Sequence, residues 1–310
     1  MSAPLRPFRF GVQCFDAPTG KHWLEDARRA EGLGYDTLLM PDHFGPQFAV
    51  FAGLTAAATV TTTLRVGTLV AANDFRHPLV LAKEAATLDL ISGGRFELGL
   101  GAGWDGSDYA ETGIPLASAA ERVERLTESI AVLKAAFSGE RFSFTGRHYQ
   151  VTGYEPVPLP VQRPHPPLMI GAGSPKLLGL AAQEAGIVAL APRTRADGSG
   201  LIRANVAPEA TKKKIGWVRE AAGARFAELE LSVLVFGVAV TSDRDSAARA
   251  LAGEWDLTAE DVLASPHFLV GTVSEIADEL VSTRERLGIS YWVVQDLEPF
   301  ASVLEQLAGR

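Results

Sequence analysis

Short hydrophobic runs alternate with amphipathic stretches along the whole chain. Eight of the runs are apolar enough and short enough to predict buried β-strands. They span Phe8–Cys14, Thr37–Pro41, Leu64–Val70, Phe96–Leu100, Pro167–Gly171, Ile187–Leu190, Leu231–Val240 and Ser290–Gln295. The intervals between these runs have helical periodicity. The clearest helix is expected after Ser118, because Ser118 and Glu121 have the spacing of a capping box and apolar residues follow at helical intervals. Strands and helices are therefore expected to alternate.

This alternation predicts parallel βαβ units, and eight strands are the number that closes a (β/α)8 TIM barrel. We therefore expect residues 1–310 to form a single barrel domain. An open doubly wound sheet is the alternative, but it would need a glycine-rich turn after the first strand, and Phe15–Gly20 is not one. Two segments are longer than ordinary loops and predict insertions near residues 139–166 and 193–208. In the first segment, apolar and polar residues alternate on both sides of Thr145, which predicts a β-hairpin. The second segment is polar and is a candidate lid.

The composition narrows the class of protein. Hydrophobic residues make up 47% of the 310 residues and charged residues 21%, which is typical of a globular enzyme. The net charge of −8 argues against a nucleic-acid partner or an anionic membrane surface. A single cysteine, Cys14, excludes an intramolecular disulfide and fits a reducing compartment. With no hydrophobic run long enough to cross a membrane, we expect a soluble cytoplasmic protein.

The first candidate for chemistry is Asp42-His43-Phe44, which follows the apolar run Thr37–Met40. In a (β/α)8 barrel, the carboxyl ends of the strands form the mouth where catalytic residues lie. A histidine there can exchange a proton near neutral pH, and a neighbouring carboxylate can orient it. A hydrogen-bonded structural histidine is the alternative, so the tripeptide alone does not decide between the two.

The segment Ile170–Pro175 is a second candidate. Its glycines allow close backbone approach, Ser174 can cap a helix, and Pro175 suits a first helical turn. A helix N-terminus with free N–H groups is a phosphate site, although an ordinary strand-to-helix turn would have the same sequence.

Alternating glycines at the end of the fourth strand, Gly99–Gly103, leave one strand face without side chains. This suits the edge of a flat ring, or a neighbouring backbone. The six histidines show no metal-binding spacing, so no metal is expected. We therefore expect a site that takes its reactivity from a phosphate-bearing organic cofactor.

In this order and spacing, several motifs resemble the luciferase-like monooxygenase superfamily, in particular its actinobacterial branch that uses the deazaflavin coenzyme F420. The resemblance covers essentially the whole chain. It rests on Met40–Phe44, Val66–Val70, Phe75–Pro78, Leu98–Trp104 and Met169–Pro175.

The resemblance implies a luciferase-like (β/α)8 barrel with insertions, often a homodimer, in which a bulge at Leu69-Val70 with a non-proline cis peptide braces the cofactor ring. It also implies that His43 handles a proton beside the ring, with Asp42 as a catalytic, ring-contacting or structural residue. The cofactor contacts it implies are Asp42, Thr68, Leu69, Val70, Gly101, Gly103, Gly171, Ala172, Gly173 and Ser174. The substrate pocket is expected at Phe44, Phe75 and Trp104.

Two positions depart from the family's sugar-phosphate dehydrogenases. Trp104 stands where they carry a glutamate, and Gln47 stands where they carry a tryptophan. We therefore expect a more apolar small-molecule substrate and an F420-dependent hydride transfer. An FMN-dependent monooxygenase that reacts with O2 is the alternative, and a barrel that binds a cofactor without turnover is a third hypothesis.

Overall fold

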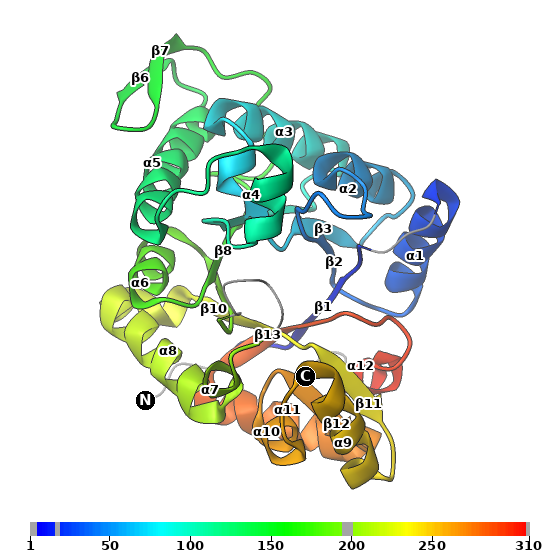
Figure 1. The fold of residues 1–310 in the computed structure, drawn as a ribbon. Helices are drawn as coiled ribbons and strands as arrows, with labels where there is room; N and C mark the ends of the chain where they lie inside the picture. The colour runs from blue at the N-terminus through cyan, green and yellow to red at the C-terminus, as the bar shows by residue number, and fades with distance from the viewer. Residues whose placement is uncertain (1–4, 16–18, 194–200, 308–310) are drawn as a thin grey trace.

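Eight parallel strands form a closed ring at the centre of the computed structural model, which describes residues 5–15, 19–193 and 201–307 (Figure 1). The ring closes because β1 pairs with both β2 and β13, and β3 pairs with β5. The predicted (β/α)8 barrel is therefore confirmed. Its strands are β1 (Arg9–Gln13), β2 (Thr37–Met40), β3 (Arg65–Thr68), β5 (Phe96–Gly101), β8 (Leu168–Ala172), β9 (Ile187–Leu190), β10 (Glu230–Leu234) and β13 (Ile289–Val294).

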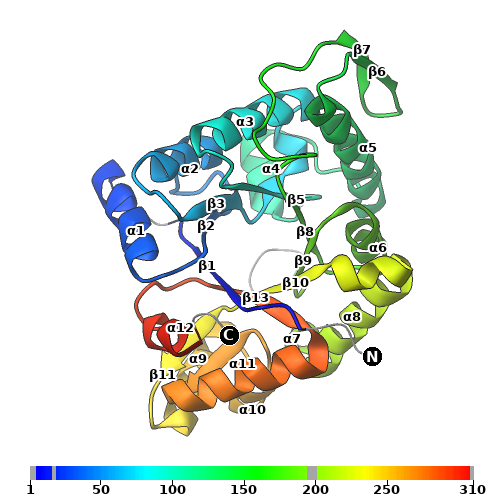
Figure 2. The same cartoon turned by 180° about the vertical axis from the view of Figure 1, so that it is seen from behind.

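Helices surround this ring on all sides (Figures 1 and 2). They are α1 (Gly20–Gly32), α2 (Val50–Thr59), α3 (Pro78–Ile91), α5 (Ala119–Ser138), α6 (Pro175–Glu184), α8 (Pro208–Ala222), α11 (Val273–Leu287) and α12 (Ala301–Leu307). The predicted cap of α5 is present, since Ser118 accepts the N–H of Glu121, and in α11 Thr272 and Glu275 form a full capping box. Within the described ranges, no helix is both long and apolar enough to span a bilayer.

The inside of the barrel is layered, because alternate residues of each strand point inward. At the amino ends of the strands, Arg9 forms ion pairs with Glu97 and Glu230, and Arg65 reaches Glu97 as well. An apolar layer follows, made by Leu39, Met169, Ile187, Ala189, Tyr291 and Val293. These two layers close the lower barrel, so a ligand has room only at the carboxyl ends of the strands.

A bulge interrupts the barrel between β3 and β4 (Ala71–Ala72). β3 pairs with β5 up to Gly67 opposite Glu97, and pairing resumes at Ala71 opposite Leu100. One strand therefore has three intervening residues and the other has two, which is the count of a β-bulge. Thr68 fills the gap in the ladder, because its hydroxyl donates to the carbonyl of Gly99 at 2.6 Å and accepts the Gly99 N–H at 2.9 Å.

The first predicted insertion contains the expected hairpin, formed by β6 (Phe142–Thr145) and β7 (Gln150–Tyr154). It projects beside α5 (Figure 1), and Glu128 of α5 holds its turn by accepting three consecutive backbone N–H groups, from Arg147 to Tyr149. In the second insertion, residues 194–200 of the candidate lid lie outside the described residues. Its described part contains the short helix α7 (Arg203–Val206).

The predicted strand Leu231–Val240 is wrong as a single element. Val235 still donates its N–H to Val293 of β13, but Phe236 donates to His267, so the chain changes partner between these two residues. The second half is β11 (Gly237–Val240), which pairs with β12 (Phe268–Gly271) outside the barrel and packs with α9 (Arg244–Trp255) and α10 (Ala259–Ala264). The hydrophobic run continues through both halves, although β10 is buried in the barrel whereas β11 is only partly buried and packs Ala239 against a separate core.

Candidate active site

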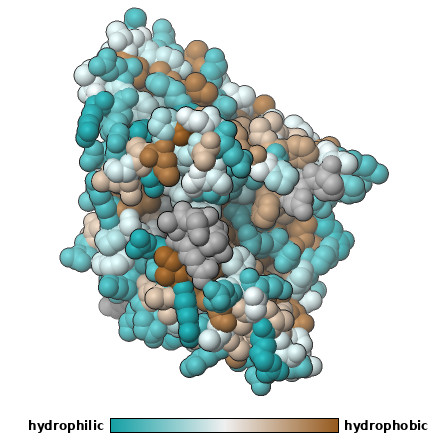
Figure 3. All heavy atoms as spheres, in the orientation of Figure 1, coloured by the Kyte–Doolittle hydropathy of each residue, from teal (hydrophilic) through white to brown (hydrophobic). Residues whose placement is uncertain are grey.

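The candidate residues lie at the carboxyl ends of the strands, the end of the barrel over which α4 (Gly106–Thr112) lies in Figure 1. The space-filling view from the same side shows this face hollowed near its centre, beside the grey atoms (Figure 3). His43 follows β2, Val70 lies in the bulge after β3, and Ser174 follows β8. Since these strands adjoin one another through β3 and β5, the structure brings the predicted proton handler, bulge and glycine loop to one mouth.

A carboxylate from α4 holds His43. Its Nδ1 lies 2.6 Å from Oδ2 of Asp108, and Oδ1 of the same carboxylate accepts the backbone N–H of Phe44 at 3.0 Å. Asp108 is buried, whereas the side chain of His43 is 30% exposed. The imidazole is therefore fixed on one side and open on the other, which is the arrangement a proton-transferring histidine needs.

The three aromatic residues predicted to line a substrate pocket lie close to this histidine in the chain or in space, and their role as a pocket stays a prediction. Trp104 meets the His43 ring edge-on at 5.7 Å between centroids, and Phe44 meets Phe75 at 4.9 Å. Trp104 and Phe44 are each about half exposed, unusually so for residues of their size and apolarity. The polar side chain of Gln47 donates a hydrogen bond to the nearby backbone carbonyl of Pro41. The rim beside His43 is therefore apolar.

Asp42 faces the bulge rather than open space. Both of its oxygens are hydrogen-bonded by the Arg76 guanidinium, and one of them also accepts the N–H of Ala72 in β4. Arg76 in turn reaches Glu84 on α3. This arrangement makes Asp42 a brace between the end of β2 and the far side of the bulge, and its role in chemistry or ring contact stays a prediction.

The bulge itself has the expected backbone. The Leu69–Val70 peptide bond is cis, as the family resemblance implied. The carbonyl of Leu69 accepts a hydrogen bond from Gln13 Nε2 at 2.8 Å, and Gln13 Oε1 accepts one from Gln295. Two glutamines from β1 and the end of β13 therefore hold the bulge from across the barrel, while Leu69 and Val70 remain partly exposed at the mouth.

The glycines of β5 and β8 make room for side chains of the protein itself. A Cβ on Gly101 would lie 2.6 Å from Val70 Cγ2, and one on Gly171 would lie 3.3 Å from Val70 Cγ1. Gly103 has a positive φ of 78°, and its missing side chain leaves space for the hydroxyl of Tyr109. The predicted contacts Gly101 and Gly103 thus shape the wall behind the site, and any cofactor contact they make stays a prediction.

The loop after β8 ends in the expected helix cap. Ser174 Oγ accepts the N–H of Leu177, and Pro175 is the first helical residue of α6. Gly173 allows β8 and β9 to approach closely, since a Cβ there would lie 2.7 Å from the carbonyl of Ala191. Gly171, Gly173 and Ser174 are partly exposed, whereas Ala172 and the predicted contact Thr68 are buried. The exposed part of this loop presents a helix N-terminus to the mouth, which suits an anion.

Sequence reasoning missed Asp108, Asp105, Gln13 and Tyr109. Asp108 and Asp105 both lie near His43, and one ligand atom from each of the three side chains lies within 4.8 Å of the others. This group has cation-binding residue types, but Asp105 Oδ1 caps α4 through Ser107, and both oxygens of Asp108 are engaged, by His43 and Phe44. The only sequence signal was the position of these aspartates in a helix start directly after a glycine-rich strand end.

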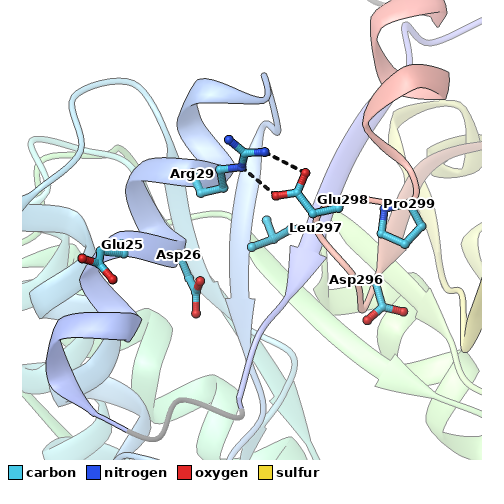
Figure 4. Close-up of a pocket in the computed structure, with 7 residues that line it drawn as sticks. All are labelled: Glu25, Asp26, Arg29, Asp296, Leu297, Glu298 and Pro299. Atoms are coloured by element: carbon cyan, nitrogen blue, oxygen red, sulfur yellow. Dashed lines mark hydrogen bonds and ion pairs between the residues drawn. The ribbon is translucent and has the colours of Figure 1, made fainter.

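A cavity of about 430 Å³ lies away from the mouth, between α1 and the segment after β13 (Figure 4). It is lined by Glu25, Asp26, Arg29, Asp296, Leu297, Glu298 and Pro299. Its one cation, Arg29, is engaged by Glu298 at 2.7 Å. Four carboxylates with a single neutralised cation would repel a phosphate, so this cavity does not compete with the barrel mouth as a cofactor site.

A closed parallel barrel with a histidine, a cis-peptide bulge and a capped glycine loop at its mouth defines the class of (β/α)8 enzymes that work at the carboxyl ends of their strands. The chain belongs to the luciferase-like monooxygenase family, whose model matches residues 7–291. It is therefore an enzyme of an oxidoreductase and monooxygenase family.

Solved structures with the same fold include both kinds of enzyme. A coenzyme F420 dependent tetrahydromethanopterin reductase from Methanopyrus kandleri is 18% identical, with a TM-score of 0.78 over 97% of this chain and 98% of the other. The monooxygenase RslO1 from Streptomyces bottropensis is 23% identical, with a TM-score of 0.73 over 96% of each chain. EDTA monooxygenase from Chelativorans sp. BNC1 is 15% identical, with a TM-score of 0.78 over 97% of this chain and 93% of the other.

Proposed function

We propose that this protein is an F420-dependent oxidoreductase that moves a hydride between the deazaflavin and a small organic substrate. The observation that carries the proposal is the His43 imidazole, held at Nδ1 by Asp108 and open beside the Leu69–Val70 bulge. A hydride transfer to or from a C–O or C–N centre also moves a proton, and a fixed histidine beside the ring supplies that function.

The residues at the mouth fit a phosphate-bearing tricyclic cofactor. The partly exposed loop Gly171–Ser174 at the start of α6 would receive the phosphate, since its N–H groups point out of the helix start. Leu69 and Val70 would lie against one face of the ring, supported by Gln13 and the glycines behind them. When bound there, a deazaflavin supplies a two-electron hydride carrier that reacts poorly with oxygen.

The substrate is expected to be apolar around its reacting carbon. Phe44 and Trp104 present large apolar surfaces beside His43, and the neighbouring cations are already occupied: Arg76 by Asp42, and Arg125 by Asp74. A substrate anchored by its own phosphate would find no free partner among these side chains. A small, largely apolar alcohol, carbonyl compound or imine fits this rim better.

An FMN-dependent monooxygenase is the alternative. Monooxygenases share this fold, and the same loop and bulge would accept FMN. The resemblance of the sequence motifs to the F420-dependent branch supports F420. A barrel that binds the cofactor without turnover remains the third hypothesis, and His43 is the residue that separates it from an enzyme.

The deciding experiment titrates the protein with F420 and with FMN while their absorbance and fluorescence are recorded. Binding of F420 is the expected result, and tight binding of FMN with no binding of F420 would overturn the proposal. His43→Ala should then bind F420 as the parent protein does but lose single-turnover hydride transfer, measured with alcohols, enones and imines. Unchanged transfer in His43→Ala would refute the role of His43.

A second copy of this chain is the partner we propose. The outer faces of α2 and α3 form a groove of about 500 Å³, lined mainly by apolar and small side chains such as Phe51, Ala52 and Ala56. Val80 and Ile91 add exposed apolar surface on α3. Helices that are apolar on several sides usually pack against a partner. Ala56→Glu should therefore convert a dimer to a monomer in sedimentation velocity, whereas a protein already monomeric at micromolar concentration would contradict the proposal.

A further inference from the structure

The Asp108 carboxylate is clamped between two consecutive residues of the loop after β2. One oxygen accepts from the Phe44 N–H and the other faces His43 Nδ1 at 2.6 Å. A carboxylate has only acceptors, so the nitrogen that faces it carries a proton. The neutral imidazole therefore has its hydrogen on Nδ1, and Nε2 carries the lone pair.

The other ring nitrogen is free. Nε2 of His43 makes no hydrogen bond to any residue that the structure describes, and it is not among the buried polar atoms without a partner. With the side chain 30% exposed, Nε2 is the atom that a ligand in the mouth can reach. Trp104 covers one side of the ring edge-on.

The helix that carries Asp108 is itself fixed. Asp105 caps α4 through the N–H of Ser107, and Thr112 donates its hydroxyl to the carbonyl of Asp108. Tyr109 donates to Asp74, which is held by Arg125. The bonds of Asp105 and Thr112 lie within α4 and its cap, whereas Tyr109 joins the helix to Asp74 and the Phe44 N–H holds the Asp108 carboxylate itself. The carboxylate therefore keeps its place when the imidazole turns, and it selects one ring orientation.

We propose that Asp108 is a positioning residue that sets the tautomer of His43, so that Nε2 is the atom that exchanges a proton with the substrate. The proton exchange with substrate rests on the proposed function, whereas the tautomer of His43 does not depend on it. In the oxidising direction, Nε2 would take the substrate hydroxyl proton, and a bound deazaflavin would supply the two-electron acceptor for the hydride that leaves the same carbon. The substrate is oxidised by two electrons, and the imidazolium that results is stabilised by Asp108. Reduction is the reverse.

The test is Asp108→Asn. The Phe44 N–H still requires an acceptor, so the amide oxygen is held there and the amide NH₂ faces His43 Nδ1. Nδ1 must then accept, which moves the proton to Nε2. The 15N chemical shifts of labelled histidine, assigned by comparison with His43→Gln, report the tautomer without cofactor or substrate.

We expect an Nδ1–H tautomer in the parent protein and an Nε2–H tautomer in Asp108→Asn. Asp105→Asn, which keeps a good helix cap three residues away, should retain the parent tautomer. An Nε2–H tautomer in the parent protein overturns the inference, even if the Asn variant does not fold. The same tautomer in the parent and in a folded Asp108→Asn protein overturns it as well.

Kinetics give the second measurement. The wrong tautomer of a catalytic histidine lowers turnover by up to about 10⁴-fold in a related carboxylate–histidine arrangement. We expect single-turnover transfer in Asp108→Asn to fall by roughly 10²-fold or more while the Kd for F420 stays within about 2-fold. A tautomer switch in a protein that binds no F420 would refute the proposed function and leave the inference standing, so the two failures are distinguishable.

Discussion

Asp42 and Arg76 form a two-point ion pair at the mouth of the barrel. Arg76 Nη1 lies 2.5 Å from Asp42 Oδ2, and Nη2 lies 3.1 Å from Oδ1. The same carboxylate accepts the N–H of Ala72, directly after the bulge. One pair therefore joins the end of β2, which carries His43, to the strand that follows the Leu69–Val70 peptide.

Removing the carboxylate should loosen this connection. Asp42→Ala leaves the buried Ala72 N–H without its acceptor and the Arg76 guanidinium with only Glu84, so we expect the free energy of unfolding to fall by about 3 kcal/mol. Chemical denaturation measures the change. We also expect cofactor affinity to fall, since the bulge would lose a support.

The exposed pair between Lys21 and Glu25 is the control for this variant. Both side chains are more than half exposed, so Lys21→Ala should change the free energy of unfolding by less than about 0.5 kcal/mol. Equal losses in Asp42→Ala and Lys21→Ala would contradict the bracing role of Asp42.

Val70 and Gly101 are expected to be energetically coupled. Gly101→Ala would place a Cβ 2.6 Å from Val70 Cγ2, so we predict a loss of stability of about 2 kcal/mol. Val70→Ala in the same chain removes the clashing methyl groups and should recover most of that loss. A double-mutant cycle by denaturant unfolding measures the coupling.

Two glycines serve as comparisons for Gly101. Gly216, in α8, has no atom within 4 Å of an added Cβ, so Gly216→Ala should be neutral or slightly stabilising. At Gly99 the added Cβ would lie 1.9 Å from the backbone carbonyl of Thr68, and trimming Val70 should not rescue Gly99→Ala. Rescue of both glycine variants by Val70→Ala would disprove a specific contact.

Glu31 should make the protein more stable above pH 4.5 than near pH 2. Burial alone would raise the pKa of Glu31, but hydrogen bonds from the backbone of Thr63, Leu64 and Thr62 outweigh it and lower the pKa to about 2. The folded carboxyl thus holds its proton less tightly than the unfolded one. Its stabilisation is complete above the unfolded pKa and is lost as the pH falls toward the folded pKa.

The measurement compares the parent protein with Glu31→Gln by denaturant unfolding across pH 2 to 7. We expect a difference of about 1 kcal/mol at neutral pH that shrinks below pH 4.5. Glu25→Gln, on the exposed face of the same helix, is the control. A difference between parent and Glu31→Gln that does not depend on pH would contradict the prediction.

Lys214 should also make stability rise with pH, but over an alkaline window and because its charged form is buried. It lies on α8 with only 2% of its surface exposed, and burial lowers its pKa from 10.5 to about 8. The unfolded chain therefore binds more protons between pH 8 and 10.5, and stability rises with pH through that window. Below pH 8 the buried ammonium destabilises the fold.

Lys214→Met should accordingly be more stable than the parent at pH 7, by about 2 kcal/mol, and the advantage should shrink as the pH approaches 10.5. Lys212→Met removes a charge from the exposed side of the same helix and is the matched control. Lys214→Met that is destabilised at pH 7 would show that the hydrogen bond to the Asn205 carbonyl outweighs the burial of the charge.

Hydrophobic periodicity predicted the barrel, because strands of period two and helices of period 3.6 leave distinct patterns in a sequence. It predicted His43 at a strand end, the β6–β7 hairpin and the cap at Ser174 for the same local reason. It failed at Leu231–Val240, where β10, a buried strand of the barrel, is followed in the chain by β11, a partly buried strand of the separate β11–β12 sheet. Burial alone does not tell which core a residue enters.

The sequence by itself determined the order of the elements, the mouth to which His43 belongs and the family of the chain. Only the tertiary structure decided that Asp108 faces His43 across 65 positions of chain, that Arg76 engages Asp42, and that Gly101 and Gly103 accommodate Val70 and Tyr109. The local sequence pattern indicates which face of its own helix or strand each residue occupies. Contacts between residues after different strands depend on which strands lie side by side in the closed barrel, and the local pattern does not indicate this arrangement.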